Sequence, residues 1–230
     1  MLTAKNYWGS LILGMMVVWA QEAVTPVPVE PVPVEKEPLH QVVLKNESIM
    51  VMHLVLPPGE RTLYHTHSHD RVAVNLSSAS ITQQKLGEPE GAATTAAPGN
   101  FSAITLEGSA YTHRVHNVSA APYEVIDVEL LERPGTASTA TAAVMAAENP
   151  SARIYSWVLA PGTTSAMHTH VRPYLIVATT DLNLRMTGPD EQTSTHEVKR
   201  GQFHWVDAKV THSLGNAGST AGHIVEIELK

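Results

Sequence analysis

Six histidines stand in two matching groups and could form metal-binding sites. Residues 65–67 and 168–170 both read His-Thr-His, and a further histidine follows each group. On a β-strand, residues i and i+2 point to the same side, about 6.6 Å apart at ~3.3 Å per residue. Two such imidazoles can bind one ion with bonds of about 2.0–2.1 Å, and a third can come from another strand. The predicted ligands are His65, His67 and His113 in the first group, and His168, His170 and His212 in the second.

The ligand types restrict the metal. The chain contains no cysteine, which rules out a thiolate zinc site, a disulfide and a cysteine nucleophile. Neutral imidazoles suit transition metals, and three of them leave coordination positions open for water, dioxygen or a substrate. We therefore expect a divalent transition metal, with Fe, Cu, Mn, Ni, Zn and Co all compatible with the ligands.

The two histidine groups belong to an internal repeat. Leu-Pro-Pro-Gly at 56–59 matches Leu-Ala-Pro-Gly at 159–162, and Val-Ala-Val at 72–74 matches Leu-Ile-Val at 175–177. These pairs and the His-Thr-His pair all lie 103 residues apart. His113 and Asn117 match His212 and Asn216 at a distance of 99 residues. The glycine before each histidine pair permits a sharp turn into the strand.

These motifs resemble those of the cupin superfamily. Gly-x5-His-x-His begins at Gly59 and at Gly162, and His-x3-Asn begins at His113 and at His212. Two copies over residues 40–230 are similar to a bicupin. The resemblance implies an all-β fold of two tandem double-stranded β-helix (jelly-roll) barrels, each with a metal ion inside.

The sequence departs from the first motif of this family at one position in each copy. The first motif usually adds a glutamate four residues after the second histidine, where this chain has Arg71 and Tyr174. An arginine beside a divalent ion costs Coulomb energy unless it turns away, so Asp70 is an alternative ligand if the strand bulges. The hydroxyl of Tyr174 could hydrogen-bond a ligand or reach the metal. We therefore place the working site in the second copy, with Tyr174 orienting the substrate.

Other side chains receive structural interpretations. Residues 123–130 and 224–229 alternate apolar with acidic side chains, which is typical of strands with one buried face. We expect the acidic side chains to form a solvated face, and Asn117 and Asn216 to hold turns. Core packing or cavity lining is expected of four large side chains in the second copy, Met167, Met186, Phe203 and Trp205. His69 and His116 are interpreted as loop or surface residues. No partner is identified for His40, His53, His196, His204 or His223.

The chain divides into five segments. Residues 1–20 are predicted to be a signal peptide, because Leu11–Ala20 is an apolar run shorter than the ~20 residues that span a bilayer. An uncleaved membrane anchor is the alternative. Residues 21–39 repeat Pro-Val-Pro-Val-Glu and predict an extended spacer. The first module is assigned to 40–135, a linker or short helix to 136–149, and the second module to 150–230.

These predictions combine into a functional hypothesis. The net charge is −7, and the sequence has no phosphate-binding loop or basic aromatic strip, so nucleic acid is not an expected partner. We expect an exported bicupin, periplasmic or extracellular, that binds a transition metal and oxidises a small organic molecule with dioxygen. A homodimer is compatible with this hypothesis, and membrane contact would require an uncleaved signal segment. The alternative is a non-enzymatic ligand-binding or envelope protein with a structural or vestigial metal site.

Overall fold

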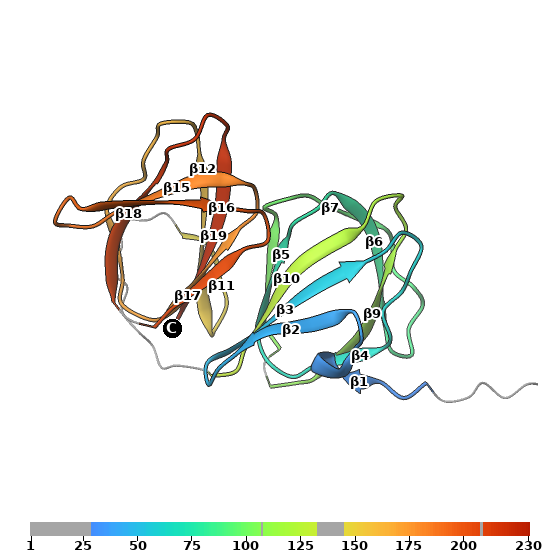
Figure 1. The fold of residues 1–230 in the computed structure, drawn as a ribbon. Coiled ribbons are helices and arrows are strands. Elements are labelled where there is room, and N and C mark those ends of the chain that lie inside the picture. Colours follow the sequence, from blue (N-terminus) through green and yellow to red (C-terminus); the bar gives the residue numbers. More distant parts are fainter. Residues whose placement is uncertain (1–28, 107, 133–144, 208) are drawn as a thin grey trace, which may run out of the picture.

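The computed structural model describes residues 29–106, 108–132, 145–207 and 209–230, which form two β-barrels lying side by side (Figure 1). Almost all regular structure is β-strand, and the strands form four sheets. The predicted all-β architecture of two tandem barrels is confirmed. The predicted signal peptide at 1–20, residues 21–28 of the spacer and residues 136–144 of the second linker lie outside the described residues.

The first barrel is built from ten strands and one short 3-10 helix. One of its sheets has the order β1-β4-β9-β6-β7, and the other has the order β2-β3-β10-β5-β8. The elements are β1 (Val32–Pro33), η1 (Val34–Lys36), β2 (His40–Lys45), β3 (Ile49–Leu56), β4 (His65–His67), β5 (Arg71–Asn75), β6 (Ala79–Lys85), β7 (Thr94–Ala96), β8 (Phe101–Ile104), β9 (Tyr111–Asn117) and β10 (Tyr123–Leu130).

The second barrel repeats this plan with nine strands. Its sheets have the orders β11-β12-β19-β14-β17 and β13-β18-β15-β16. The elements are β11 (Met145–Glu148), β12 (Ala152–Leu159), β13 (His168–His170), β14 (Tyr174–Ala178), β15 (Leu182–Thr187), β16 (Thr193–Val198), β17 (Phe203–Val206), β18 (Val210–Asn216) and β19 (Gly222–Leu229).

The first barrel starts earlier than residue 40. β1 pairs in parallel with β4, so that Val32 lies opposite His65. Val34, in η1, is only 1% exposed and packs with Met50 and Met52. Residues 32–39 were expected to belong to an extended spacer, but Val34 is buried against the barrel and Val32 is partly buried. β11 likewise pairs with β12 and adds residues 145–148 of the expected linker to the second barrel.

The largest apolar cluster lies between the two barrels. The outward face of β10 contributes Ile126, Val128 and Leu130, and the outward face of β19 contributes Val225 and Ile227. All five side chains are at most 1% exposed. At about 25 cal/mol per Å² of buried apolar surface, this sheet-on-sheet contact is a major source of stability.

The expected solvated acidic face is wrong. Asp127 and Glu129 on β10 are 2% exposed, and Glu226 and Glu228 on β19 are fully buried. Each strand does have one apolar and one acidic face, but the acidic face was assigned to the wrong side. The apolar face of each strand packs against the other barrel, which leaves the acidic face pointing into its own barrel.

The same turn leads into each histidine strand. Gly59 has φ 75° and Gly162 has φ 73°, a left-handed conformation that glycine adopts without steric cost. The backbone N–H of each glycine donates to the carbonyl of Asn117 or Asn216, at 2.9 Å in both cases. The asparagine amides donate in turn to the carbonyls of Leu56 and Leu159, also at 2.9 Å. The predicted role of the asparagines in turns is confirmed.

Polar contacts also join the barrels. Asp70 accepts a hydrogen bond from Ser151 Oγ at 2.8 Å and another from the backbone N–H of Leu106 at 2.9 Å. Arg200 of the second barrel donates to the carbonyl of Leu76 at 3.0 Å and pairs with Glu124. Asp70 therefore belongs to the junction and is not part of the metal cluster, which corrects its interpretation as an alternative ligand. Within the described ranges, no helix has the length and apolarity needed to cross a membrane.

Candidate metal centres

Strand pairing brings the predicted ligands together in both barrels. β4 pairs with β9 so that His65 lies directly opposite His113, and β13 pairs with β18 so that His168 lies opposite His212. The intervening threonines point to the other side, where Thr66 and Thr112 share a hydrogen bond of 2.8 Å. The i, i+2 arrangement inferred from the sequence is therefore present in each copy.

All six histidines are buried, with exposures of at most 2%, and their rings converge. In the first barrel the ring centroid of His65 lies 5.0 Å from that of His67 and 4.6 Å from that of His113. None of the six Nε2 atoms has a hydrogen-bond partner. A buried nitrogen without a hydrogen bond is costly, so the three in the first barrel fit a metal site, while those in the second barrel face the carboxylate of Glu226. Within each cluster, the potential ligand atoms all lie within 4.8 Å of one another.

Hydrogen bonds at the outer nitrogens orient the first-barrel rings. Nδ1 of His65 faces the carbonyl of Leu63 at 2.9 Å, and Nδ1 of His67 faces Glu129 Oε1 at 3.0 Å. These acceptors place the ring proton on Nδ1 and leave the lone pair of Nε2 for an ion. In the second barrel, His168 Nδ1 meets the carbonyl of Ala166 at 3.0 Å in the same way.

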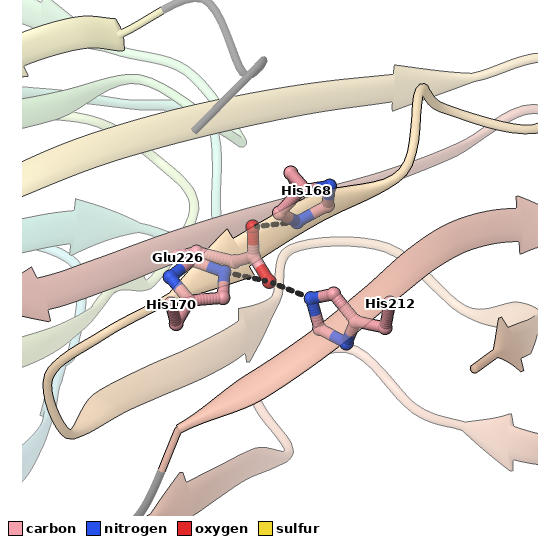
Figure 2. Close-up of side chains that lie close together, drawn as sticks. All are labelled: His168, His170, His212 and Glu226. Atoms are coloured by element: carbon pink, nitrogen blue, oxygen red, sulfur yellow. Dashed lines mark ion pairs between the residues drawn. The ribbon is translucent and has the colours of Figure 1, made fainter. Parts of the chain in front are cut away.

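The second barrel contains a fourth potential ligand that the sequence interpretation missed. Glu226 projects from β19 between the three imidazoles (Figure 2). Its carboxylate oxygens lie 3.5 Å from His168 Nε2 and 3.4 Å from both His170 Nε2 and His212 Nε2. Ligands on a tetrahedral ion with bonds of about 2.0–2.1 Å would be separated by about 3.4 Å. The donor set of three imidazoles and one carboxylate therefore fits a divalent transition metal.

Neighbouring side chains hold Glu226 in place and adjust the proton affinities. Trp157 Nε1 donates to Glu226 Oε2 at 2.6 Å, and the indole ring stacks on His168. Burial raises the pKa of Glu226, but its three histidine contacts outweigh this and hold it well below the usual range. Burial lowers the pKa of His170, but Glu226 and Glu228 outweigh it and raise the value to about 9. In the metal-free protein the cluster thus holds an ionised carboxylate and a protonated imidazole at neutral pH.

The first barrel has a different charge arrangement at the equivalent positions. Asp127 stands where Glu226 stands 99 residues later, and Arg71 stands where Tyr174 stands 103 residues later. Arg71 Nη1 donates to Asp127 Oδ2 at 2.6 Å, so this carboxylate pairs with the guanidinium, and the metal cluster contains histidines alone.

Burial is the main reason why the first-barrel histidines have lowered pKa values. Burial, followed by the charge of His40, lowers the pKa of His65 to about 3. Burial, followed by the charge of His65, lowers the pKa of His113 to about 2. The charge of Arg71 lowers both values further.

Tyr174 lies between the side-chain cluster of the second barrel and a cavity. Its ring stacks on His170, with centroids 3.9 Å apart and planes 17° apart, and its buried hydroxyl has no hydrogen-bond partner. Burial and the nearby carboxylates raise the pKa of Tyr174, so its hydroxyl keeps its proton. The same residue lines a cavity of about 760 Å³ whose walls also include Met186 and Phe203. Trp205 instead packs toward the junction between barrels, and Met167 is 40% exposed.

The remaining histidines have partners that sequence alone did not reveal. His40 lies 4.5 Å from His65 between ring centroids, and its Nδ1 faces Glu37 Oε2 at 2.7 Å. His69 is partly exposed and shares Glu129 with His67. His223 bridges Ser156 and Thr179. The other pairs or placements are His53 with Glu124, His116 with Glu90, and both His196 and His204 in the wall of the second cavity.

Solved structures share this fold. No known family profile matches the sequence, and no curated protein matches it. Salicylate 1,2-dioxygenase from Pseudoaminobacter salicylatoxidans, solved as adducts with gentisate, superposes with a TM-score of 0.54 at 13% identity, over 81% of this chain and 70% of its own. A cupin 2 conserved barrel domain protein from Leptotrichia buccalis gives 0.52 at 14% identity, over 90% and 100%. Oxalate decarboxylase from Bacillus subtilis, described with Mn(II) centres, gives 0.52 at 11% identity, over 80% and 69%.

The fold and the two histidine clusters thus place the chain in a structural class. It is a bicupin by fold, as the repeated motifs predicted. Each barrel has a buried cluster that could hold a metal ion.

Proposed function

We propose that this protein is an exported, metal-dependent oxidoreductase of dioxygenase type. Its working ion would be held in the second barrel by His168, His170, His212 and Glu226. Dioxygen would serve as the oxidant, and both oxygen atoms would enter a small organic substrate. The observation that carries the proposal is the position of Tyr174, which stacks on a ligand of the four-residue cluster and also forms the wall of a large cavity.

Residues around the ion would have different roles in the reaction. A redox-active ion would bind dioxygen and the substrate at its open coordination positions. Glu226 provides a negative charge that offsets the charge of the ion, and Trp157 fixes its orientation through a hydrogen bond. Tyr174 retains its proton, so it would donate a hydrogen bond to an oxygen atom of the bound substrate.

The cavity indicates the character of the substrate. Its walls are mainly apolar, and polar groups are few. The apolar walls come from all six strands from β14 to β19, while His196, Gln202 and His204 supply polar atoms. A pocket with apolar walls and few polar groups fits a small, largely apolar organic molecule that is oriented at one end.

Export is proposed from the N-terminal sequence. The apolar run at 11–20, with a small residue at each end of Val18-Trp19-Ala20, supports cleavage by a signal peptidase. Mass spectrometry of the secreted protein should find Gln21 at the N-terminus. An intact residue 1 in a membrane fraction would instead support the anchor.

The test of the metal function compares the barrels directly. The protein is purified without chelator, and bound metals are measured in the wild type, in Glu226→Gln and in His168→Ala/His170→Ala. We expect the wild type to contain Fe, Mn, Cu or Ni, and this metal content to be lower in both second-barrel variants. The rate of oxygen consumption with small, largely apolar substrates should decrease together with the metal content. The control is His65→Ala/His67→Ala, which should keep that activity. Oxygen consumption that survives loss of the second-barrel metal would overturn the assignment.

One observation also favours the non-enzymatic alternative. The 3.4–3.5 Å separations between Glu226 and the histidine nitrogens suit a closed tetrahedral ion, which has no open position. A purified protein that contains only zinc, with no exchangeable water on a cobalt substitute, would identify a structural site. The second barrel would then be a binding module for an apolar ligand.

A further inference from the structure

The first barrel contains a second cavity, of about 370 Å³, that the proposed oxidation does not use. Its lining is markedly more polar than that of the second-barrel cavity. Arg71, Asp127, Asn100 and Ser102 line it together with the three histidines of the first cluster. At about 30 Å³ per water-sized group, it has room for about a dozen such groups.

Arg71 and Asp127 leave hydrogen-bonding capacity unused in this cavity wall. Their side chains are 8% and 2% exposed, and one bond joins Nη1 to Oδ2. The Nε donor of Arg71 and the Oδ1 acceptor of Asp127 have no partner. Buried polar atoms normally find one, and each that does not costs about 1–3 kcal/mol. A ligand that offers an acceptor beside the guanidinium and a donor beside the carboxylate would satisfy both.

The charges of the cavity favour an anionic ligand. Asp127 already pairs with Arg71, so a cation held by the three histidines would lack a counter-charge among the residues of its cluster. A guanidinium presents its donors in a planar fork that matches a carboxylate. The second-barrel cavity has no cation among the residues that line it, and Glu226 already supplies negative charge to the cluster beside it.

His40 adds a further polar group to the same wall. Its Nδ1 bonds to Glu37, a buried carboxylate that also accepts the backbone N–H groups of Leu39 and Leu63. With the proton on Nδ1, Nε2 of His40 is an acceptor, and a ligand hydroxyl could donate to it. Glu37, from the segment that was expected to be a spacer, thus orients a side chain that lines the first cavity.

We propose that the first barrel binds a small hydroxycarboxylate, with Arg71 holding the carboxylate and Asp127 or His40 accepting the hydroxyl. This site is separate from the proposed oxidation in the second barrel and does not depend on it. The fold keeps it apart, because the inward faces of β5 and β10 form the first cavity and those of β14 and β19 border the second site.

Calorimetric titration of the full chain with three matched probes tests the proposal. Malate carries both features, succinate lacks the hydroxyl, and malamide lacks the charge. Both enantiomers of malate are titrated. We expect the tighter-binding enantiomer to bind at least about tenfold more tightly than malamide and several-fold more tightly than succinate. Equal binding of malate and malamide would overturn the charge argument. Failure of malate, glycolate and tartrate to bind at up to about 10 mM would overturn the site.

Variants locate the binding. Arg71→Gln/Asp127→Asn replaces the ion pair by a neutral pair of similar shape and should weaken malate binding at least about tenfold. Arg71→Lys keeps the charge without the fork and should cause a smaller loss, which provides a test if the double variant does not fold. Arg200→Gln, a partly exposed arginine outside the cavity, and His168→Ala/His170→Ala should bind malate like the wild type. Unchanged binding in the Arg71 variants, or loss in the second-barrel variant, would refute the assignment.

Discussion

Metal binding in the two barrels should depend on pH in different ways, because their histidines begin in different protonation states. In the second barrel, Glu226 and Glu228 raise the pKa of His170 to about 9. An ion must displace that proton at pH 7. In the first barrel, burial lowers the pKa of His65 to about 3 and that of His113 to about 2, so the ligands are already neutral.

The size of the effect follows from linkage. Between pH 7 and pH 8, below the pKa of about 9, each pH unit relieves about 1.4 kcal/mol of proton competition at His170. The affinity of the second site should therefore rise about tenfold over this interval. The affinity of the first site should change less than about twofold, because its ligand pKa values lie far below pH 7. Binding at pH 7 should release about one proton from the second site and none from the first.

Each site can be measured alone. His65→Ala/His67→Ala leaves only the second site, and His168→Ala/His170→Ala leaves only the first. Titration of each variant with zinc at pH 7 and pH 8, in two buffers of different ionisation enthalpy, gives both the affinity and the number of protons released. The same pH dependence in both variants would refute the proposed difference in charge arrangement.

Three further predictions concern single positions. Glu226→Gln should weaken metal binding in the second barrel by at least about tenfold, because a neutral amide replaces the carboxylate, while the first site measured in parallel stays unchanged. Tyr174→Phe should leave metal content unchanged and lower turnover about tenfold or more, because only the hydroxyl is lost; equal turnover would show that the hydroxyl has no role. Ile126→Ala, at the junction, should lower the free energy of unfolding by about 2–5 kcal/mol in denaturant titrations, against less than about 0.5 kcal/mol for an exposed control, Val158→Ala.

The sequence predicted the elements that local geometry determines. A His-x-His strand fixes which side its imidazoles take, and the 103-residue repeat indicated that both copies use it. The sequence analysis expected His113 and His212 to supply a third imidazole from another strand, and the structure shows the strand pairings that bring each opposite the first histidine of its pair. The turns at Gly59 and Gly162 followed from glycine and asparagine chemistry.

The direction of the acidic faces could not be read from β10 or β19 alone. Alternation shows that a strand has two unlike faces, but the choice of the inner face depends on what covers the other. Here the first barrel covers the apolar face of β19, so Glu226 turns into its own barrel and becomes a candidate ligand. One signal was available, because a chain of two barrels must bury a surface between them, and matching apolar faces on both repeats are suited to that contact.

The substitutions that distinguish the barrels occur as a pair, and charge balance explains why. An inward carboxylate on the central strand needs a positive partner. In the second barrel the imidazole cluster is the positive partner of Glu226. Tyr174 is neutral, so it leaves Glu226 free to approach the three histidines. In the first barrel Arg71 pairs with the shorter Asp127, and the group of potential ligand atoms contains no carboxylate. In the first barrel, replacing Arg71 or Asp127 alone would bury an unpaired charge, at a cost of about 3–5 kcal/mol. The two barrels therefore represent two self-consistent solutions on one scaffold, one with the carboxylate in the metal cluster and one with it in the wall of a polar cavity.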